Sequence, residues 1–253
     1  MKLTFLGTGT SQGVPVIACS CPVCQSADTR DKRLRTAALI EHNGVTIAID
    51  AGPDFRQQML QAKVKNLDAI LVTHEHRDHI SGLDDVRAFN WINKRPMDIW
   101  GESRVLDAIR TEYSYVFAEH KYPGIPEICL NEIDGQPIDI MGLKITPIRA
   151  YHYKLPIYGF RIGDLTYITD ANFIAEEEKE KIVGSKYLII NALRMQKHLS
   201  HYSLPEALKL IAELGPRRAY IIHVSHQLGL YKDIATQLPE NVCLAYDGLT
   251  VEC

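Results

Sequence analysis

The sequence has 253 residues, which is enough to bury a substantial core, and we expect one domain over residues 1–253. Its 28 basic and 31 acidic residues give a formal net charge of −3, so the composition carries no polyanion-binding signature. The N-terminus lacks the apolar core and cleavage site of a signal peptide, and no apolar run approaches membrane-spanning length. We therefore expect a soluble cytoplasmic protein. The composition neither requires nor excludes a nucleic-acid substrate.

The first part of the chain predicts a strand, a glycine-rich turn and an antiparallel pair of strands. Gly7-Thr8-Gly9 follows the strand 2–6, but its spacing differs by one residue from a dinucleotide-binding loop and no helix opens after it. The strands 36–41 and 45–49 flank His42-Asn43-Gly44, a strong hairpin signal. Asp54 then precedes a helix over 55–61, as a cap or first-turn acid.

The remainder alternates between short apolar strands and amphipathic helices. Further strands are predicted at 69–72, 97–100, 128–133, 138–140, 143–150, 159–162, 165–169, 187–191, 219–222, 242–245 and 249–251. Further helices are predicted at 83–90, 104–117, 176–183, 203–214 and 231–237, and residues 119–126 are expected to form an irregular loop. Ser203 and Glu206 form a capping box with Pro205 in the first turn. This order suggests an α/β sandwich of sheets covered by helices.

A dense group of metal-ligand side chains follows the strand 69–72. His74, His76, Asp78 and His79 lie within six residues, where we expect the buried strand to give way to a loop. Isolated histidines such as His42 and His120 are usually surface or hydrogen-bonded residues, whereas four ligands at this spacing indicate a metal site. Imidazole and carboxylate together suit Zn²⁺ or Mn²⁺ better than Mg²⁺ or Ca²⁺.

Other strands also end in an acid or an imidazole, namely at His152, Asp170 and His223, so these side chains are expected to converge at one sheet edge. With them, the His-x-His-x-Asp-His segment 74–79 closely resembles the signature of the metallo-β-lactamase superfamily. The resemblance covers nearly the whole chain, including Asp50-Ala-Gly before the motif. It implies a four-layer αββα sandwich with two metal ions at its edge.

The resemblance also implies how the ligands divide. One metal would be held by His74, His76 and His152, and the other by Asp78, His79 and His223, with Asp170 bridging them. The aspartate at 170, where true β-lactamases resemble one another in carrying cysteine, argues against antibiotic hydrolysis and favours the phosphodiesterase branch. Two closely spaced cations can share a water, lower its pKa and stabilise charge on a phosphoryl group.

His201 is the candidate residue for assisting the departure of the leaving group. The segment His201-Tyr-Ser-Leu-Pro-Glu-Ala resembles the stretch that precedes a helix in tRNA-processing endonucleases and related small phosphodiesterases. There the histidine faces the scissile phosphate, so His201 would donate a proton to the leaving oxygen or hydrogen-bond a phosphoryl oxygen. A surface histidine before a helix is the plain alternative, and His198 is a weaker stand-in.

A second metal site is expected near the N-terminus. Cys19, Cys21 and Cys24 supply three thiolates, which leaves tetrahedral zinc one ligand short. The sequence resembles PhnP-type phosphoribosyl cyclic-phosphate phosphodiesterases in combining this element with a late histidine, which makes His226 the candidate fourth ligand of a structural zinc. A redox dithiol or ordinary small core residues are the alternatives.

These features together predict a metal-dependent phosphodiesterase acting on small cyclic phosphates or nucleotide-like diesters, with Asp78, Asp170 and His201 in its catalytic machinery. A tRNA 3′-processing endonuclease ranks second, because no long Gly/Pro-rich insertion separates Asp170 from His201. A third hypothesis is a metal-binding accessory protein of cofactor biosynthesis. The sequence leaves open the natural substrate, Mn²⁺ or Zn²⁺ in the active site, and a monomer or a homodimer.

Overall fold

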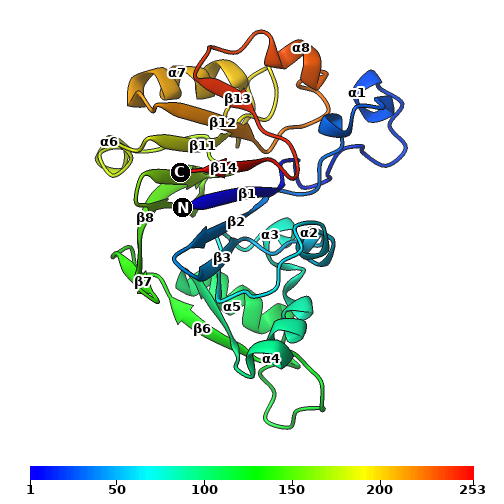
Figure 1. The fold of residues 1–253 in the computed structure, drawn as a ribbon, viewed down its shortest axis with the longest axis vertical. Coiled ribbons are helices and arrows are strands. Elements are labelled where there is room, and N and C mark those ends of the chain that lie inside the picture. The colour runs from blue at the N-terminus through cyan, green and yellow to red at the C-terminus, as the bar shows by residue number, and fades with distance from the viewer.

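The computed structural model describes residues 1–253, whose strands form two seven-stranded sheets (Figure 1). The first sheet has the order β14 (Thr250–Glu252), β1 (Lys2–Gly7), β2 (Ala37–His42), β3 (Val45–Ile49), β4 (Ala69–Leu71), β5 (Met97–Gly101) and β6 (Ile128–Glu132). The second has the order β13 (Val242–Leu244), β12 (Arg218–Ile222), β11 (Tyr187–Asn191), β10 (Leu165–Ile168), β9 (Leu155–Ile162), β8 (Leu143–His152) and β7 (Ile138–Ile140).

Each sheet is antiparallel in one part and parallel in the other. Strands β1, β2 and β3 pair antiparallel, and β3 to β6 run parallel. In the second sheet β7 to β10 pair antiparallel, and β10 to β13 run parallel. The parallel parts matter most for function, because the carboxyl ends of neighbouring parallel strands open at one edge.

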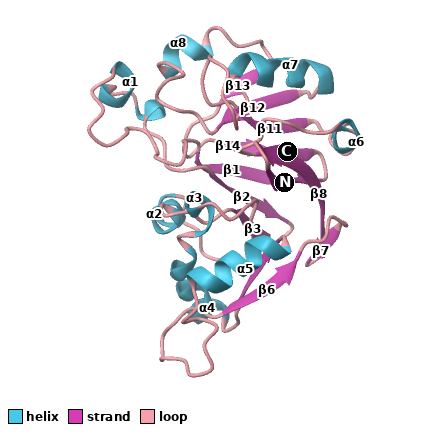
Figure 2. Cartoon of the chain, turned by 180° about the vertical axis from the view of Figure 1, so that it is seen from behind, coloured by secondary structure: helices cyan, strands magenta, loops and turns pink.

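Helices cover the outer faces of both sheets (Figure 2). On the first sheet lie α2 (Phe55–Gln61), α3 (Arg77–Ile80), η2 (Leu83–Val86), α4 (Arg87–Asn93) and α5 (Ser103–Glu112). On the second lie α6 (Glu176–Lys179), α7 (Leu204–Leu214) and α8 (Tyr231–Ala235), while α1 (Pro22–Gln25) and η1 (Thr29–Asp31) belong to the N-terminal loop. No helix combines the length and apolar character needed to cross a bilayer.

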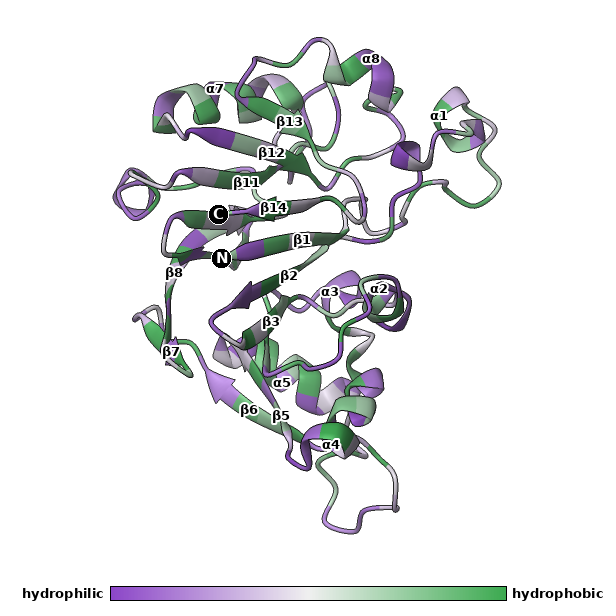
Figure 3. Cartoon of the chain, in the orientation of Figure 1, coloured by the Kyte–Doolittle hydropathy of each residue, from purple (hydrophilic) through white to green (hydrophobic).

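Three apolar clusters hold these layers together. Between the sheets, residues such as Phe5, Ile47, Phe160 and Tyr167 are fully or almost fully buried. The outer face of the second sheet packs against α7, and that of the first packs against α2 and α5. Apolar and polar residues alternate along α7, and its buried residues recur every three or four positions, as expected of a helix with one buried side (Figure 3). The predicted αββα sandwich is confirmed.

Several element boundaries differ from the sequence prediction for tertiary reasons. The predicted helix 104–117 ends at Glu112, because the next turn folds back so that the Tyr113 hydroxyl donates to the carbonyl of Ile80. The predicted helix 176–183 ends at Lys179, and β9 starts at Leu155 rather than 159. The predicted helix 83–90 is instead η2 followed by α4.

The two predicted helix starts have different outcomes. At α7 the capping box forms, since the backbone N–H of Ser203 donates to the Glu206 carboxylate at 2.9 Å. At α2, Asp54 holds the N-cap position without a capping hydrogen bond. Its carboxylate instead accepts from the backbone and guanidinium of Arg35, at 2.8 and 3.0 Å, and so joins the segment before β2 to the start of α2.

Candidate metal centre

The candidate ligands lie where strands of both sheets end at one edge. His74 follows β4, Asp170 follows β10 and His223 follows β12. Asp170 and His223 adopt left-handed backbone conformations with φ of 59° and 54°, as does Asp50 after β3 with φ of 65°. Such conformations cost energy in residues other than glycine and cluster at functional sites. These abrupt turns bring side chains together from strands that are far apart in sequence.

The three histidines expected to share the first metal form one group. The ligand atoms of His74, His76 and His152 all lie within 4.8 Å of one another, and Nε2 of His74 is 3.1 Å from Nδ1 of His76. His152 donates from Nδ1 to the carbonyl of Ser200 at 2.8 Å, which leaves its Nε2 free to face the other two. This arrangement orients imidazole lone pairs towards a common position.

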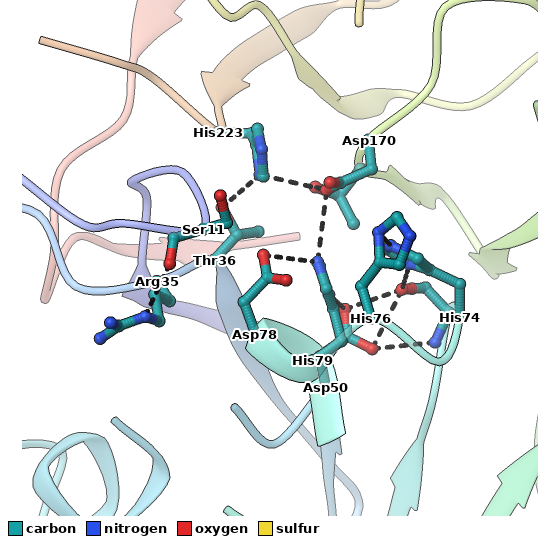
Figure 4. Close-up of polar contacts among 12 residues, drawn as sticks. Ser11, Arg35, Thr36, Asp50, His74, His76, Asp78, His79, Asp170 and His223 are labelled. Carbon is teal, nitrogen blue, oxygen red and sulfur yellow. Dashed lines mark hydrogen bonds and ion pairs between the residues drawn. The ribbon is translucent and has the colours of Figure 1, made fainter. Parts of the chain in front are cut away.

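The residues expected around the second metal meet at Asp170 (Figure 4). Its Oδ1 lies 3.1 Å from Nδ1 of His223 and 3.6 Å from Nε2 of His79, and that same Nε2 lies 3.2 Å from Oδ2 of Asp78. Asp170 also shares a cluster with His74 and His79. The structure therefore brings all seven predicted ligands together, with Asp170 between the two histidine groups.

His79 is held in one orientation by a buried carboxylate. Its Nδ1 donates to Asp50 at 2.7 Å, and Asp50 also accepts from the backbone N–H and hydroxyl of Thr73. Burial raises the pKa of Asp50, and the bonds from His79 and Thr73 oppose that rise. Burial opposes protonation of His79, but the carboxylates of Asp50, Asp170 and Asp78 outweigh it and raise the pKa of His79 well above its ordinary value. Its Nε2 is the ring atom that faces Asp78 and Asp170.

The donor set fits divalent metal ions. Nε2 of His79 is fully buried yet has no hydrogen-bond partner, although two carboxylates lie near it. Burial lowers the pKa of His74 well below its ordinary value, which favours the neutral, ligating imidazole. Burial opposes ionisation of Asp170, but the charges of His223 and His79 outweigh it and hold the pKa of its carboxyl well below the usual range. Imidazole nitrogens beside ionised carboxylates are a donor set that suits Zn²⁺ or Mn²⁺.

The motif contains a short helix where the sequence prediction placed a loop. Residues 77–80 form α3, so Asp78 and His79 lie on a helical turn directly after His76. Gly52 makes this possible, because a Cβ there would lie 1.9 Å from the carbonyl oxygen of Asp78. The close approach lets the Asp50-Ala-Gly segment support α3, with the backbone N–H of Ala51 donating to the carbonyl of His79.

His201 lies beside the predicted ligands. Its ring centroid is 4.5 Å from that of His152 and 4.8 Å from that of His223, and its Nδ1 is buried without a hydrogen-bond partner. Burial and the nearby His223 lower the pKa of His201 to about 2. His198 stacks on its outer side at 5.2 Å. His201 is therefore the nearer of the two to the predicted ligands, whereas His42 and His120 stand apart from this cluster.

The cysteine loop forms a separate cluster with His226. Nδ1 of His226 lies 3.3 Å from the sulfurs of Cys19 and Cys21 and 3.6 Å from that of Cys24. The backbone N–H of Cys24 donates to the sulfur of Cys21 and is the main cause that lowers the pKa of Cys21 to about 6. Three thiols converging on one imidazole nitrogen, with a thiolate favoured among them, fit a tetrahedral zinc site.

The segment 223–226 connects the two clusters. It carries His223 at the candidate metal centre and His226 at the cysteine cluster, and the backbone N–H of Val224 donates to the carbonyl of Thr8 at 2.9 Å. The hydroxyl of Thr36 lies 3.2 Å from Nδ1 of His223 and donates to the carbonyl of Gly9. The N-terminal glycine-rich turn thus supports the segment, a role that its sequence does not reveal.

Sequence reasoning missed two residues near the site. The sequence places Asp50 only at the end of a strand and within the stretch that resembles the superfamily, yet its carboxylate orients the ring of His79. Arg194, in the loop between β11 and α7, lines the same cavity as His201 and was not singled out. A buried acid at a strand end was an available signal for Asp50. No local pattern distinguishes Arg194 from other surface arginines.

Comparison with known proteins identifies the family. The family described as beta-lactamase superfamily domain matches residues 45–224. A Porphyromonas gingivalis protein named octanoyltransferase is 42% identical over 252 residues, which cover 98% of this chain but 51% of that protein. Ribonuclease Z from Bradyrhizobium diazoefficiens is 32% identical over 164 residues, covering 62% of this chain and 48% of that protein. The chain spans about half the length of the curated relatives it matches.

Solved structures agree over the full chain. The crystal structure of a diphosphatase from the PhnP family superposes with a TM-score of 0.93 at 34% identity, covering 100% of this chain and 97% of that one. Zinc-bound PqqB from Methylobacterium extorquens, at 17% identity, superposes with a TM-score of 0.79 and covers 100% of both chains, which supports the fold alone. The chain therefore belongs to the β-lactamase superfamily, with a metallo-β-lactamase fold of the PhnP-like kind.

Proposed function

We propose that the chain is a phosphodiesterase with two divalent metal ions, Mn²⁺ or Zn²⁺, acting on small cyclic phosphates or nucleotide-like diesters. The observation that carries the proposal is the position of Asp170 between the His74–His76–His152 group and the residues Asp78, His79 and His223. A carboxylate between two ligand groups has two oxygens and can contact an ion on each side, which suits a paired metal site. The likeness to a diphosphatase of the PhnP family supports phosphorus–oxygen hydrolysis.

The proposed ligands divide as the resemblance implies. His74, His76 and His152 would hold one ion, and Asp78, His79 and His223 the other, with Asp170 shared. When bound, the two ions would acidify a water and neutralise charge on the phosphoryl oxygens. The chain's own contribution is orientation: Asp50 holds His79, and the carbonyl of Ser200 holds His152. Such outer contacts typically change metal affinity or activity 10–100-fold when removed.

The test is metal-resolved activity against a panel of substrates. The stripped protein, reloaded with Mn²⁺ or Zn²⁺, is expected to hydrolyse at least one of a cyclic nucleotide, phosphoribosyl cyclic phosphate and an aryl phosphodiester. Turnover of precursor tRNA alone would instead favour the endonuclease, which the ribonuclease Z relatives keep as an alternative. Inactivity towards every diester would favour the accessory role suggested by relatives named coenzyme PQQ synthesis protein B.

His201 is proposed as the group at the leaving oxygen. His201→Ala is expected to lower kcat by roughly 10²–10⁴-fold, because it removes a positioned hydrogen-bond donor while leaving all seven proposed ligands in place. Metal content by elemental analysis should match that of the wild type. His42→Ala, at the far end of β2, is the matched control for loss of one imidazole. Wild-type turnover by a His201→Ala protein that binds both metals would contradict the role.

The name octanoyltransferase belongs to a relative about twice as long as this chain. Its activity is therefore not proposed for this chain.

A further inference from the structure

Four side chains of alternating charge run beside the ligands proposed for the first metal ion. Glu75, which lies inside the motif between its first two histidines, forms an ion pair with Arg104 of α5. Arg104 also pairs with Glu102 at 3.1 Å. The carboxylate of Glu102 in turn accepts hydrogen bonds from both terminal nitrogens of Arg149, at 2.6 and 3.1 Å. The series Glu75–Arg104–Glu102–Arg149 is called the ion-pair chain below.

The ion-pair chain joins the two halves of the sandwich. Glu75 and the start of α5 belong to the first sheet's half, whereas Arg149 lies on β8 of the second sheet. Arg104 also donates to the carbonyl of Pro156 on β9 at 2.5 Å. The proposed ligands of the first ion are divided in the same way, since two of its histidines follow β4 and His152 ends β8. The ion-pair chain therefore spans the boundary that this ion would span.

Both ends of the ion-pair chain lie next to a proposed ligand. At one end, Glu75 immediately precedes His76. At the other, Arg149 lies three residues before His152 on the same strand. The rings of His76 and His152 have centroids 5.1 Å apart, so the two ends of the ion-pair chain flank the gap between these two histidines.

His76 has no outer support of its own. The ring of His152 donates to the carbonyl of Ser200, but the only hydrogen-bond partner of the His76 ring is His74, itself a proposed ligand. The residue is also exposed, so packing does not fix it. Its position therefore depends on the backbone around it, and the ion pair of Glu75 is the side-chain contact next to it that reaches the second half.

The ion-pair chain is shielded well enough to hold its geometry. Its four side chains are between 22% and 33% exposed. The paired atoms of Glu75 and Arg104 are hidden from solvent, and neither has a hydrogen-bond partner elsewhere. Burial opposes ionisation of Glu102, but the bonds and charges of Arg149 and Arg104 outweigh it and lower the pKa of its carboxyl. Breaking a shielded pair leaves the other charge uncompensated, so the neighbouring backbone is expected to move.

We propose that the ion-pair chain sets the spacing of His76 and His152, and with it the metal affinity of the first position, the one formed by His74, His76 and His152. Arg104, which contacts both halves, is its central positioning residue. The inference rests on the paired metal site of the proposed function and deepens it by naming the contacts that hold one position.

The second position has separate supports and should not depend on the ion-pair chain. Asp50 orients His79, and the Thr36 hydroxyl lies 3.2 Å from Nδ1 of His223. Neither support belongs to the ion-pair chain or bonds to it. A change at Arg104 is therefore expected to separate the two positions, which a general loss of stability would not do.

The test is a calorimetric titration with Mn²⁺ of protein stripped of metal at the centre. Mn²⁺ prefers oxygen ligands to thiolates, so the cysteine cluster can keep its zinc. The wild type is expected to bind two equivalents. Arg104→Met should weaken one of them about 10–100-fold, the usual effect of removing an outer contact, and leave the other unchanged. Arg110→Met, which removes an arginine paired with Asp107 on the same helix, is the matched control and should bind as the wild type does.

Two backgrounds identify the weakened position. A His223→Ala protein keeps all three ligands of the first position, and Arg104→Met should still weaken its Mn²⁺ binding. A His152→Ala protein keeps the ligands of the second position, and there Arg104→Met should change nothing. The reverse pattern, or equal weakening of both equivalents in the otherwise wild-type protein, would contradict the inference.

Glu75→Gln is the second variant, because it removes the charge and keeps the volume of the side chain. It should weaken the same equivalent, and adding it to Arg104→Met should cost much less than its effect alone, since both changes break one contact. Wild-type Mn²⁺ affinity in both variants, even with a lower Tm, would overturn the inference and leave the proposed function intact. A wild type that binds two ions but hydrolyses no diester would overturn the function alone.

Discussion

Replacing Asp170 with alanine is expected to remove metal from the centre and to reduce kcat by roughly a thousandfold or more. Asp170 is 2% exposed and is the carboxylate on which the two groups of histidines meet. Without it, the charge of two divalent ions would be opposed by Asp78 alone among the seven proposed ligands. Elemental analysis should show fewer metal equivalents per chain, and turnover should fall on every diester that the wild type hydrolyses.

Two further variants separate charge from shape at this position. Asp170→Asn keeps the volume of the side chain but removes its charge, and it should behave like the alanine variant if the carboxylate binds metal. Asp164→Ala removes an exposed aspartate, paired with Lys186, that lies just before β10, the strand that ends near Asp170. It should retain both metals and full activity. An Asp170→Ala protein with wild-type metal content and turnover would show that Asp170 is not a shared ligand.

The cysteine cluster leads to the second large effect, which is on stability. His226→Ala is expected to lose one zinc equivalent and to lower Tm by roughly 10 °C. Ligand binding at a thousandfold excess over Kd is worth about 4 kcal/mol. In a chain of this size each kilocalorie shifts Tm by about 2–4 °C. Zinc analysis and thermal unfolding with and without a chelator would measure both effects.

Cys129→Ser provides the matched control, because Cys129 is exposed and stands outside the cluster. It should keep its zinc and its Tm, whereas Cys21→Ser should resemble His226→Ala. Activity is expected to fall moderately in the cluster variants, since His223 lies three residues from His226 on the same supported segment. Undiminished zinc in His226→Ala would exclude His226 as the fourth ligand.

The ends of the parallel strands could be predicted from sequence because each short apolar run stops at a polar ligand. This is why the sequence predicts His74, Asp170 and His223 at one edge, where the structure brings them together, and why the layered architecture could be predicted. The boundaries that were wrong depend on distant contacts. The helix α5 stops where Tyr113 meets Ile80, and the Asp54 side chain bonds Arg35 rather than its own helix.

The residues of the site that could not be predicted are those whose role depends on their contacts in the folded protein. Asp50 became informative only when Nδ1 of His79 was found 2.7 Å away. Arg194 became informative only when its acceptors proved to be uncharged and its cavity free of acids. Asp50 and His79 are 29 positions apart, and the Gln227 acceptor of Arg194 is 33 positions away, so neither contact leaves a mark on local sequence.

The two sheets contribute unequal parts of the candidate centre, and this has a consequence for folding. His74, His76, Asp78 and His79 come from the first sheet's half, whereas His152, Asp170 and His223 come from the second. Neither half holds a complete ligand set for either ion, so tight metal uptake must await docking of the halves. Metal ions would then act as clamps across the sandwich, and stripping them should speed unfolding more than it slows refolding, since the ligands meet late.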